Sequence, residues 1–440
     1  MSFSRGLKLA GFGTRYLSRM RRGRHEVMAH LAAPRADNLP MPTFVQLRVT
    51  NLCNLRCKMC GQWGDTGIFR SLGKANATDG ENEKTRIREL IGLKREMGLD
   101  DYTRLLDELA PSRPIISLFG GEPLLYPDIV PLIQEVKRRG LTCSLITNSW
   151  HLESMARELV EAGIDTVMVS VDGPPDVHDR VRGREGSFER AASGVRALAR
   201  LRDARGSAVP MLLAILPITD LNVDDVARAL DALGDLPLDT INVGLRWFVP
   251  KETGSAYETV MKETFGVAGA SWKGFEFDGA DFAAAKGRQL TDLVKLLKGV
   301  RRQRFLDSAR GRPWISFVPD VPAEGVPGYF ADSGKTFGHD LCPVAWYFAQ
   351  VEPDGQVCFC GDFPDYFIGN VRKTPFREIW TGERAGHFRE KLAREPLPIC
   401  SRCCGSFVYG AWVRPPRSGS AAPSKPLPSP GGQECLGHVP

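Results

Sequence analysis

Residues 44–60 read Phe-Val-Gln-Leu-Arg-Val-Thr-Asn-Leu-Cys-Asn-Leu-Arg-Cys-Lys-Met-Cys, a strand-like run followed at once by three cysteines in a CxxxCxxC pattern. Three thiolates this close together can ligate three irons of one cubane cluster and leave the fourth iron without a protein ligand. An iron with an open position is a site for chemistry rather than for electron storage alone. Two alternatives stay open on the loop alone: a zinc site, which is usually built on paired CxxC units, and cysteines that lie close together by chance.

In this arrangement Cys53, Cys57 and Cys60 resemble the cluster ligands of the radical S-adenosylmethionine (radical SAM) superfamily. The resemblance implies a [4Fe–4S] cluster whose open iron binds the amino and carboxylate groups of S-adenosylmethionine (SAM). Reductive cleavage of SAM would then release a 5'-deoxyadenosyl radical that removes hydrogen from an unactivated carbon. An electron donor of the flavodoxin or ferredoxin type is the partner that this chemistry requires.

A second motif, Gly120-Gly121-Glu122-Pro123, closes the second strand unit. Two glycines let the backbone approach a ligand closely, and the neighbouring carboxylate can accept hydrogen bonds from an ammonium group. The motif is similar to the GGEP motif of radical SAM enzymes, which implies that it holds the methionyl amino group of SAM. Taken alone, the same four residues could form a tight turn before a helix.

The third and fourth strands end in further motifs that resemble the family. Thr147-Asn148-Ser149 is similar to a Thr-Asn-Gly run, with Ser149 in the glycine position, and Asn148 is therefore a cofactor-binding candidate. By the same resemblance, Ser170 and Asp172 lie near the ribose and carboxylate of SAM. Met59, which stands where an aromatic residue is usual, can still pack against adenine through its polarizable thioether.

Arg182 follows the fourth strand and is a candidate partner for the SAM carboxylate, because a guanidinium fork matches a carboxylate in shape. The alternative is a surface ion pair with Asp179 or Glu185. His178, in the same stretch, is interpreted as structural.

From residue 43 onward, strand-like runs alternate with amphipathic helical runs, which predicts an α/β fold with a parallel sheet and helices on its outside. Six such units fit the partial (β/α)6 TIM-like barrel expected of radical SAM enzymes, with the reactive groups at the C-terminal ends of the strands. The expected strands are Thr43–Thr50, Pro114–Gly120, Thr142–Asn148, Thr166–Val171, Pro210–Leu216 and Thr240–Trp247. The expected helices are Asp100–Leu109, Asp128–Arg139, Leu152–Ala162, Phe188–Leu201 and Val223–Leu233.

A cysteine-rich module follows in residues 342–409. The turn Pro353-Asp354-Gly355 predicts a hairpin that brings Cys342 and Cys360 to one end, where Cys400 and Cys403 can meet them. The module resembles the SPASM/twitch family, and its cysteine count resembles the shorter twitch form with one auxiliary [4Fe–4S] cluster on these four cysteines. Cys358 and Cys404 remain possible substitutes as ligands, and a zinc site on the same four cysteines remains the alternative. Cys143, within a strand, is interpreted as a buried apolar residue, and Cys435 as no ligand.

The organisation expected from these patterns has five parts. They are a basic leader over residues 1–42, the partial barrel over 43–250, a connecting segment over 251–341, the small C-terminal iron–sulfur module over 342–409 and a Pro/Ser/Gly-rich tail over 410–440. Within the barrel, the polar stretch from Asp65 to Met97 is interpreted as a surface insertion or a lid. Within the connecting segment, we expect an irregular stretch from Lys251 to Asp278 and one long helix from Ala280 to Ala309.

The formal net charge of +6 is modest, and much of it lies in the first thirty residues. Such a segment could be a basic amphipathic helix in weak contact with an anionic membrane surface, or a solvated leader packed on the barrel, which we favour. No signal peptide or membrane span is evident, so we expect a cytoplasmic protein with metal-ligating cysteines. Outside the N-terminus the sequence has no basic stripe with interleaved aromatic residues, so we do not expect nucleic-acid binding.

Three functions are weighed on this basis. The first is oxidation of a small molecule, with the auxiliary cluster accepting an electron from a substrate radical. The second is maturation of a ribosomally synthesised peptide by crosslinking or epimerisation. The third, a non-catalytic iron–sulfur protein, is disfavoured by the intact CxxxCxxC and Gly-Gly-Glu-Pro motifs. No catalytic acid or base is assigned.

Overall fold

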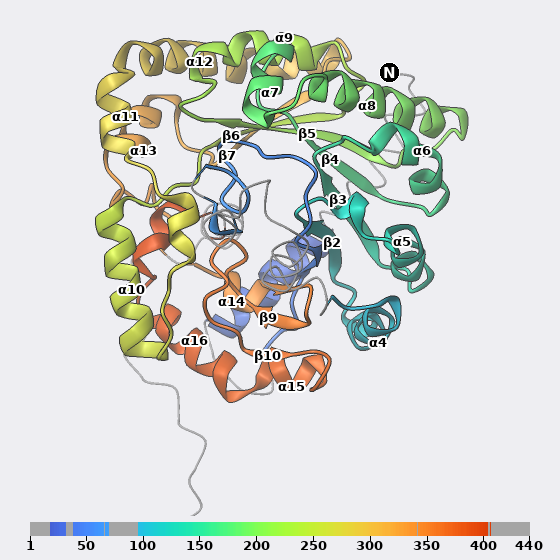
Figure 1. The fold of residues 1–440 in the computed structure, drawn as a ribbon, viewed down its shortest axis with the longest axis vertical. Helices are drawn as coiled ribbons and strands as arrows, with labels where there is room; N and C mark the ends of the chain where they lie inside the picture. The colour runs from blue at the N-terminus through green and yellow to red at the C-terminus, as the bar shows by residue number, and fades with distance from the viewer. Residues whose placement is uncertain are drawn as a thin grey trace, which may run out of the picture.

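The computed structural model describes residues 18–31, 38–65, 67–69, 96–340, 342–403 and 405. One ten-stranded sheet runs through the molecule in the order β10-β9-β8-β1-β2-β3-β4-β5-β6-β7 (Figure 1). The strands are β1 Phe44–Thr50, β2 Ile115–Gly120, β3 Thr142–Thr147, β4 Thr166–Ser170, β5 Met211–Ile218, β6 Thr240–Leu245, β7 Trp314–Val318, β8 Phe348–Val351, β9 Gln356–Cys358 and β10 Gly369–Asn370.

The six predicted barrel strands are confirmed, and all of them pair in parallel with their neighbours. Two further parallel strands extend the sheet: β7 pairs with β6, and β8 pairs with β1. Strand β7 was not predicted, because residues 251–341 were expected to form a connecting segment with one long helix. That strand is only five residues long and follows a long helix, so a short run such as Trp314–Val318 carries little signal in the sequence.

Helices cover the outer face of the sheet, as the sequence predicted (Figure 1). They are α4 Leu99–Leu109, α5 Ile129–Arg138, α6 Leu152–Glu161, α7 Pro175–Arg182, α8 Ser187–Ala204 and α9 Val226–Gly234. Successive side chains of a strand point to opposite faces, so one alternating set of strand residues packs under these helices. Val45, Leu47 and Leu118 belong to this set and are fully buried in the main core.

The segment after β6 is more helical than predicted. It contains α10 Lys251–Phe265, α11 Gly279–Ala285, α12 Gly287–Ala309 and α13 Val326–Ala331. The stretch expected to be irregular thus begins with a helix, and the single helix expected from Ala280 is divided at Lys286. Helix α10 buries Gly254, Tyr257 and Met261, and the ring of Trp272 lies so close to Gly254 that an added Cβ would meet it at 2.2 Å. A buried glycine weakens the apolar periodicity by which helices are recognised.

The C-terminal module is joined to the barrel through the sheet. Strand β8 lies beside β1, and the predicted hairpin turns at Gly355, which has a φ of 87°, into the antiparallel strand β9. Helices α14 Val344–Tyr347, α15 Phe376–Thr381 and α16 Glu383–Arg394 surround the hairpin. The indole of Trp380 donates a 2.9 Å hydrogen bond to the carbonyl of Pro40, so the module also contacts the segment before β1.

The described part of the N-terminal leader is a helix over residues 18–31 that packs on the barrel. Met20 and Val27 are buried, and the Arg19 guanidinium donates a 2.8 Å hydrogen bond to the hydroxyl of Thr142 at the start of β3. The hydroxyl of Tyr347 donates to the sulfur of Met20 at 2.9 Å. These contacts support the packed-leader interpretation for this helix. In the part of the chain that the structure describes, no helix has the length and apolar character to cross a membrane.

Several sequence expectations lie outside the described residues. They are most of the polar stretch between Asp65 and Met97, the first seventeen residues, Cys404 and the C-terminal tail with Cys435.

A buried ion pair fixes three neighbouring strands. Arg202 on α8 is fully buried, and its Nη1 lies 2.8 Å from Oδ2 of Asp239. The same carboxylate oxygen accepts the backbone N–H of Leu212 on β5, and the carbonyl of Asp239 accepts the N–H of Trp314 on β7. Removal of the cation would leave a carboxylate buried without compensation.

We therefore expect Arg202→Leu to lower the free energy of unfolding by about 3–5 kcal/mol, measured by urea denaturation. Arg196→Leu is the matched control, because Arg196 is an exposed residue on the same helix whose pair with Glu189 is open to solvent. The control should change the free energy of unfolding by about 0.5 kcal/mol or less. Equal losses in the two variants would contradict a structural role for the buried pair.

Candidate active site

The three cysteines of the first motif lie in the loop that directly follows β1, at the carboxyl end of the parallel strands. Cys57 is buried, whereas Cys53 and Cys60 are partly exposed. Each thiol accepts a hydrogen bond from a nitrogen donor. The donors are Asn148 Nδ2 at 3.7 Å from Cys53 Sγ, Arg182 Nη1 at 3.7 Å from Cys57 Sγ, and the backbone N–H groups of Gln62 and Trp63 at 3.4 and 3.5 Å from Cys60 Sγ.

Burial works against ionisation of these thiols, and the nitrogen donors work in its favour. Burial raises the pKa of Cys57 to about 12, while the Arg182 guanidinium acts in the opposite direction. Burial also raises the pKa of Cys53, and the Asn148 hydrogen bond offsets part of the rise. Ionisation of these thiols therefore requires a metal centre that replaces the thiol proton, in addition to the nitrogen donors already present. Among the described residues, no three His, Cys, Asp or Glu side chains converge as ligands of one metal ion. Thiolates on a cubane bind separate irons and do not have to converge in this way.

The Gly-Gly-Glu-Pro motif contacts the backbone at the start of the cluster loop. The N–H of Gly121 donates to the carbonyl of Thr50 at 2.8 Å, and the N–H of Glu122 donates to that of Leu52 at 2.7 Å. A Cβ added to Gly120 would meet the Thr50 oxygen at 2.3 Å, and one added to Gly121 would meet the Leu52 oxygen at 2.1 Å. The close approach that the two glycines allow is therefore to the protein's own backbone.

Glu122 joins the ends of β2 and β3. Its carboxylate is fully buried and accepts hydrogen bonds from Leu124 N at 3.0 Å, Thr147 Oγ1 at 2.8 Å and Asn148 N at 2.6 Å. Burial raises the pKa of Glu122 to about 6, although the hydrogen bonds act to lower it. The carboxylate thus holds the Gly-Gly-Glu-Pro turn against the residues that approach Cys53.

Asn148 and Ser149 follow β3. The side-chain amide of Asn148 donates both to Cys53 and, at 2.8 Å, to Oδ1 of Asn54 within the cluster loop. Ser149 has a φ of 70°, in the left-handed region that favours glycine, and it is fully buried with no hydrogen-bond partner for its hydroxyl. This conformation gives a physical reason why a glycine suits the position that Ser149 occupies.

A buried charge pair links the end of β4 to the cluster loop. Asp172 is fully buried, and Nε of Arg182 lies 2.5 Å from its Oδ2, while Nη1 of Arg182 reaches Cys57. The contact engages Oδ2, whereas Oδ1 of Asp172 has no hydrogen-bond partner among the described residues. The predicted alternative of a surface ion pair with Asp179 is wrong. Asp179 instead accepts the backbone N–H groups of Gly186 and Phe188.

The pKa values follow from this arrangement. Burial raises the pKa of Asp172, and the Arg182 charge acts to lower it. For Arg182, burial acts to lower the pKa, but Asp172 and Cys57 outweigh it and the net shift is upward. His178 is buried with its pKa well below the usual range, mainly through burial, and its Nδ1 accepts the backbone N–H of Asp172 at 3.1 Å. That bond gives His178 a structural role, as predicted. Ser170, the last residue of β4, is partly exposed.

The four cysteines predicted to hold the auxiliary cluster come together. The thiol of Cys360 interacts electrostatically with those of Cys403 and Cys342, and Cys400 forms a hydrogen bond with Cys342 that raises the pKa of Cys400 and lowers that of Cys342. Cys358 is also buried, but its thiol donates to the carbonyl of Cys360 at 3.7 Å. Burial first, and then the Glu352 carboxylate, raise the pKa of Cys358. Cys358 also interacts electrostatically with the thiol of Cys360, so it lies beside the group of four.

The sequence analysis missed a row of polar side chains that we call the inner polar seam: Gln46, Arg48, Gln350 and Glu352. Gln46 pairs with Gln350 across β1 and β8, and Nη1 of Arg48 lies 3.4 Å from Oε2 of Glu352. The amide of Gln350 donates to Oε1 of Glu352 at 2.5 Å. The available signal was the alternation of polar residues with the buried Val45, Leu47 and Val49 along β1.

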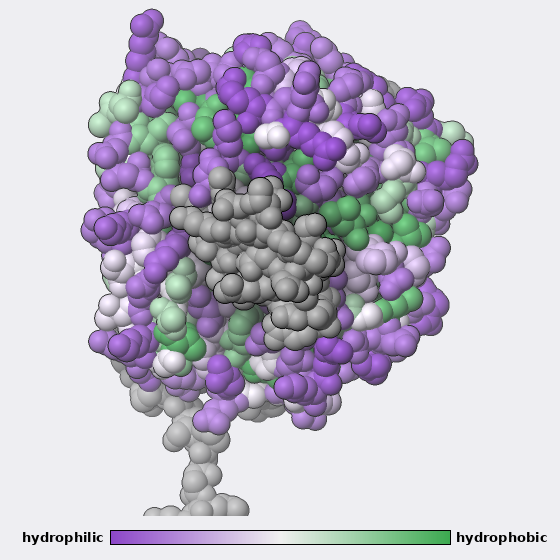
Figure 2. All heavy atoms as spheres, in the orientation of Figure 1, coloured by the Kyte–Doolittle hydropathy of each residue, from purple (hydrophilic) through white to green (hydrophobic). Residues whose placement is uncertain are grey.

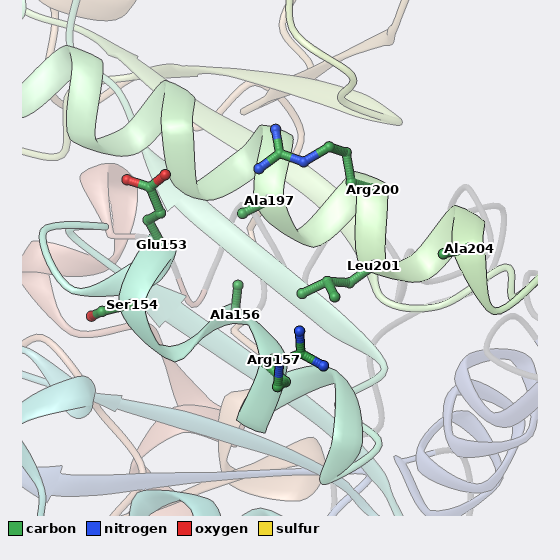
Figure 3. A pocket seen from close by; sticks show the side chains of 8 residues that line it. All are labelled: Glu153, Ser154, Ala156, Arg157, Ala197, Arg200, Leu201 and Ala204. Atoms are coloured by element: carbon green, nitrogen blue, oxygen red, sulfur yellow. The ribbon is translucent and has the colours of Figure 1, made fainter.

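A separate groove of about 490 Å³ lies between α6 and α8 on the outside of the barrel. In Figure 3 its floor is formed by small apolar side chains such as Ala156 and Ala197, and Glu153, Arg157 and Arg200 lie around it. None of the predicted site residues lines it. The surrounding molecular face is mostly hydrophilic, with small separate apolar patches (Figure 2).

Comparison with known proteins identifies the class. Residues 47–233 match the radical SAM superfamily, and residues 342–404 match the SPASM iron–sulfur cluster-binding domain. The chain belongs to the radical SAM superfamily and carries a C-terminal SPASM domain. It is therefore a radical SAM enzyme, and its cofactors are SAM, a SAM-binding [4Fe–4S] cluster and auxiliary iron–sulfur.

Curated relatives match most of the chain at low identity. Fe-coproporphyrin III synthase of Methanosarcina barkeri is 24% identical over 394 residues, covering 85% of this chain and 83% of the relative. Pre-heme d1 synthase of Dinoroseobacter shibae is 26% identical over 408 residues, covering 88% and 85%. PqqA peptide cyclase of Ruegeria pomeroyi is 27% identical over 374 residues, covering 83% and 80%. Streptococcus suis SuiB bound to the precursor peptide SuiA shares the fold, with a TM-score of 0.50 and 13% identity over 83% of this chain and 71% of that one.

The buried Glu122 makes a prediction about pH. Its folded-state pKa of about 6 lies above the ordinary 4.5, so the folded state holds this proton more tightly than the unfolded state. The group's contribution to stability is therefore present below pH 4.5 and decreases by about 2 kcal/mol as the pH rises through 6. Glu122→Gln cannot titrate. We therefore expect the unfolding free energy of the variant to rise by up to about 2 kcal/mol relative to that of the wild type as the pH increases from 4.5 to 7. A difference that does not vary with pH would rule out the raised pKa.

Ser149 makes a prediction about backbone strain. We expect Ser149→Gly to raise the free energy of unfolding by about 1 kcal/mol, because the left-handed backbone is relaxed and a buried hydroxyl without a partner is removed. Ser149→Ala is the matched control: it removes the hydroxyl and keeps the strained Cβ, so it should gain less. If alanine matched or exceeded glycine in urea denaturation, the strain argument would be incorrect.

Proposed function

We propose that this enzyme is an oxidoreductase that takes a hydrogen atom from a substrate carbon and transfers a second substrate electron to an auxiliary cluster. When bound, SAM on its cluster supplies the 5'-deoxyadenosyl radical, and the auxiliary cluster supplies an electron acceptor. The observation that carries the proposal is the placement of two cysteine groups, one after β1 and one around the hairpin of β8 and β9, in neighbouring parts of one sheet.

Cys53, Cys57 and Cys60 are the proposed ligands of the SAM-binding cluster. The support is that each thiol has a nitrogen donor in place, which stabilises a thiolate. Asn148 orients Cys53 in this assignment, and Arg182 places a positive charge beside Cys57.

The proposed SAM-binding residues are Gly120, Gly121, Glu122, Asn148, Ser170, Asp172 and Arg182. The support for Asp172 is that its Oδ1 is buried and has no hydrogen-bond donor among the described residues, which fits a hydroxyl group such as those of a ribose. Glu122 already accepts three hydrogen bonds, and its ionised carboxylate would hold an ammonium group as a further donor. Gly120 and Gly121 fix the position of that carboxylate beside the cluster loop.

Cys342, Cys360, Cys400 and Cys403 are the proposed ligands of one auxiliary [4Fe–4S] cluster. Four protein ligands leave no open iron, which suits electron transfer. The support is the mutual proximity of the four thiols, whereas the Cys358 thiol donates to the carbonyl of Cys360. An electron donor of the flavodoxin or ferredoxin type would supply the electron that cleaves SAM.

The substrate class that we propose is a tetrapyrrole. The support is that relatives spanning more than 80% of the chain are named for the synthesis of Fe-coproporphyrin III, pre-heme d1 and heme. The second candidate is a ribosomally made peptide, which the match to a PqqA peptide cyclase favours.

The proposal predicts separate effects for the two cysteine groups. The anaerobically reconstituted Cys400→Ala, Cys403→Ala double variant should keep one cluster and still form 5'-deoxyadenosine with SAM and dithionite, without an oxidised product. The Cys53→Ala, Cys57→Ala, Cys60→Ala triple variant is the control and should form no 5'-deoxyadenosine. Iron and sulfide analysis and mass spectrometry measure both. Full oxidation of substrate by the double variant would reduce the C-terminal module to a structural part.

A further inference from the structure

The inner face of the sheet differs from its outer face. The strand positions that alternate with the fully buried core residues are partly exposed on several strands, including Phe119 on β2, Met168 on β4 and Ile215 on β5. The register of β1 with β2 places Arg48 opposite Phe119, so Arg48 belongs to this inner row. Apart from Arg48 and the polar seam, the row around Phe119 is largely apolar. A substrate inside the barrel would meet these side chains.

One hydrogen-bonding edge of Arg48 has no partner among the described residues. Its side chain is 3% exposed, and only Nη1 has a hydrogen-bond partner, the Glu352 carboxylate at 3.4 Å. Nε and Nη2 are buried and have no hydrogen-bond partner within the described ranges of the chain. These two nitrogens lie on one edge of the planar guanidinium and form a fork that matches the two oxygens of a carboxylate.

The charge of Arg48 is only partly compensated. A charge-assisted hydrogen bond between guanidinium and carboxylate has a typical length of about 2.7–2.9 Å, and the single contact with Glu352 is longer. The Glu352 carboxylate also accepts the amide of Gln350 through its other oxygen. The guanidinium carbon lies 5.8 Å from the ring centroid of Phe69, which offers a face but no acceptor. A buried cation with two unpartnered donors favours an anion that can replace the atoms now packed against this edge.

Arg48 is close to both parts of the chain that carry the cysteine groups, in sequence to the first and through Glu352 to the second. It stands five positions before Cys53 on β1, and its charge acts on the thiol of Cys358 at the end of β9. Gly361, just after the auxiliary ligand candidate Cys360, packs against the side chain of Gln350, where an added Cβ would meet Oε1 at 2.7 Å. A ligand held at Arg48 therefore lies in the region that both cysteine groups border.

We propose that the Nε and Nη2 edge of Arg48 binds a carboxylate of the substrate, namely a side-chain carboxylate of a tetrapyrrole. This assignment rests on the proposed function for the class of substrate. The contrasting role for Arg48 is purely structural, in which it does no more than neutralise Glu352. If Arg48 is purely structural, a second substitution that removes the Glu352 charge should restore all properties of the wild type. If Arg48 binds the substrate, the second substitution should restore the fold and leave binding of the acid weak.

The test is a binding titration of the reconstituted full-length enzyme with SAM present, read by porphyrin absorbance and fluorescence. The probe is coproporphyrin III, and its tetramethyl ester is the matched ligand without carboxylates. Wild-type enzyme should bind the acid and should bind the ester at least about tenfold more weakly. Arg48→Gln and Arg48→Lys should both weaken acid binding by about tenfold or more, because lysine keeps the charge but lacks the fork.

Glu352 provides the fold control. The Arg48→Gln, Glu352→Gln double variant removes both charges, so it should recover the stability and cluster content of the wild type while acid binding stays weak. Glu352→Gln alone should bind the acid more tightly than the wild type, because the guanidinium loses its competing partner. Recovery of acid binding in the double variant, equal binding of acid and ester, or no binding of the acid by the wild type would overturn the assignment.

The titration separates this proposal from the proposed function. If binding of the acid depends on Arg48 but the wild type forms no oxidised product, the carboxylate-binding role of Arg48 is supported and the proposed oxidoreductase activity is contradicted. If the Arg48 variants form as much oxidised product as the wild type, the oxidoreductase activity is supported and the carboxylate-binding role of Arg48 is contradicted.

Discussion

The parallel pairing of β1 with β8 is the contact on which the rest of the site depends. β1 leads directly into the cluster loop with Cys53, and β8 leads into the hairpin that carries Cys360. Because the two strands are hydrogen-bonded neighbours in one sheet, the segments that lead into the two cysteine groups start from adjacent positions. The C-terminal module is thus a continuation of the barrel sheet. An electron acceptor held in it has a fixed distance from any group held in the cluster loop.

Buried charges at the carboxyl ends of the strands maintain this geometry. Glu122 ties the end of β2 to the end of β3, and Asp172 ties the end of β4 to Arg182 and through it to Cys57. Such groups are costly to bury unless they are paired or hydrogen-bonded. Their concentration around the three cysteines, together with the unpartnered Oδ1 of Asp172, supports the proposed role of this site in binding a polar ligand. The outer groove between α6 and α8 has no comparable set of buried charges.

The barrel could be predicted because strand-like runs alternate regularly with amphipathic helical runs. The candidate cluster cysteines could be named because their spacing is distinctive. Strand β7 and helix α10 could not be predicted, since a five-residue strand and a helix with Gly254 in its buried face give weak periodicity. The sequence also identified Arg182 but not its partner, because its pairing with Asp172 depends on the fold of α7 against β4. The contact of Arg48 with Glu352 could not be predicted either, because it depends on the pairing of β1 with β8, which joins positions 304 residues apart.

The central claim is that one enzyme holds an open cluster and a closed cluster in neighbouring parts of one sheet. Electron paramagnetic resonance of the dithionite-reduced, fully reconstituted protein, recorded before and after addition of SAM, tests it most directly. We predict two overlapping cluster signals, of which SAM alters one, because in the proposed ligand assignment only the cluster on Cys53, Cys57 and Cys60 would have an iron without a protein ligand. A single cluster signal, or two signals that both change or both stay the same when SAM is added, would contradict the account.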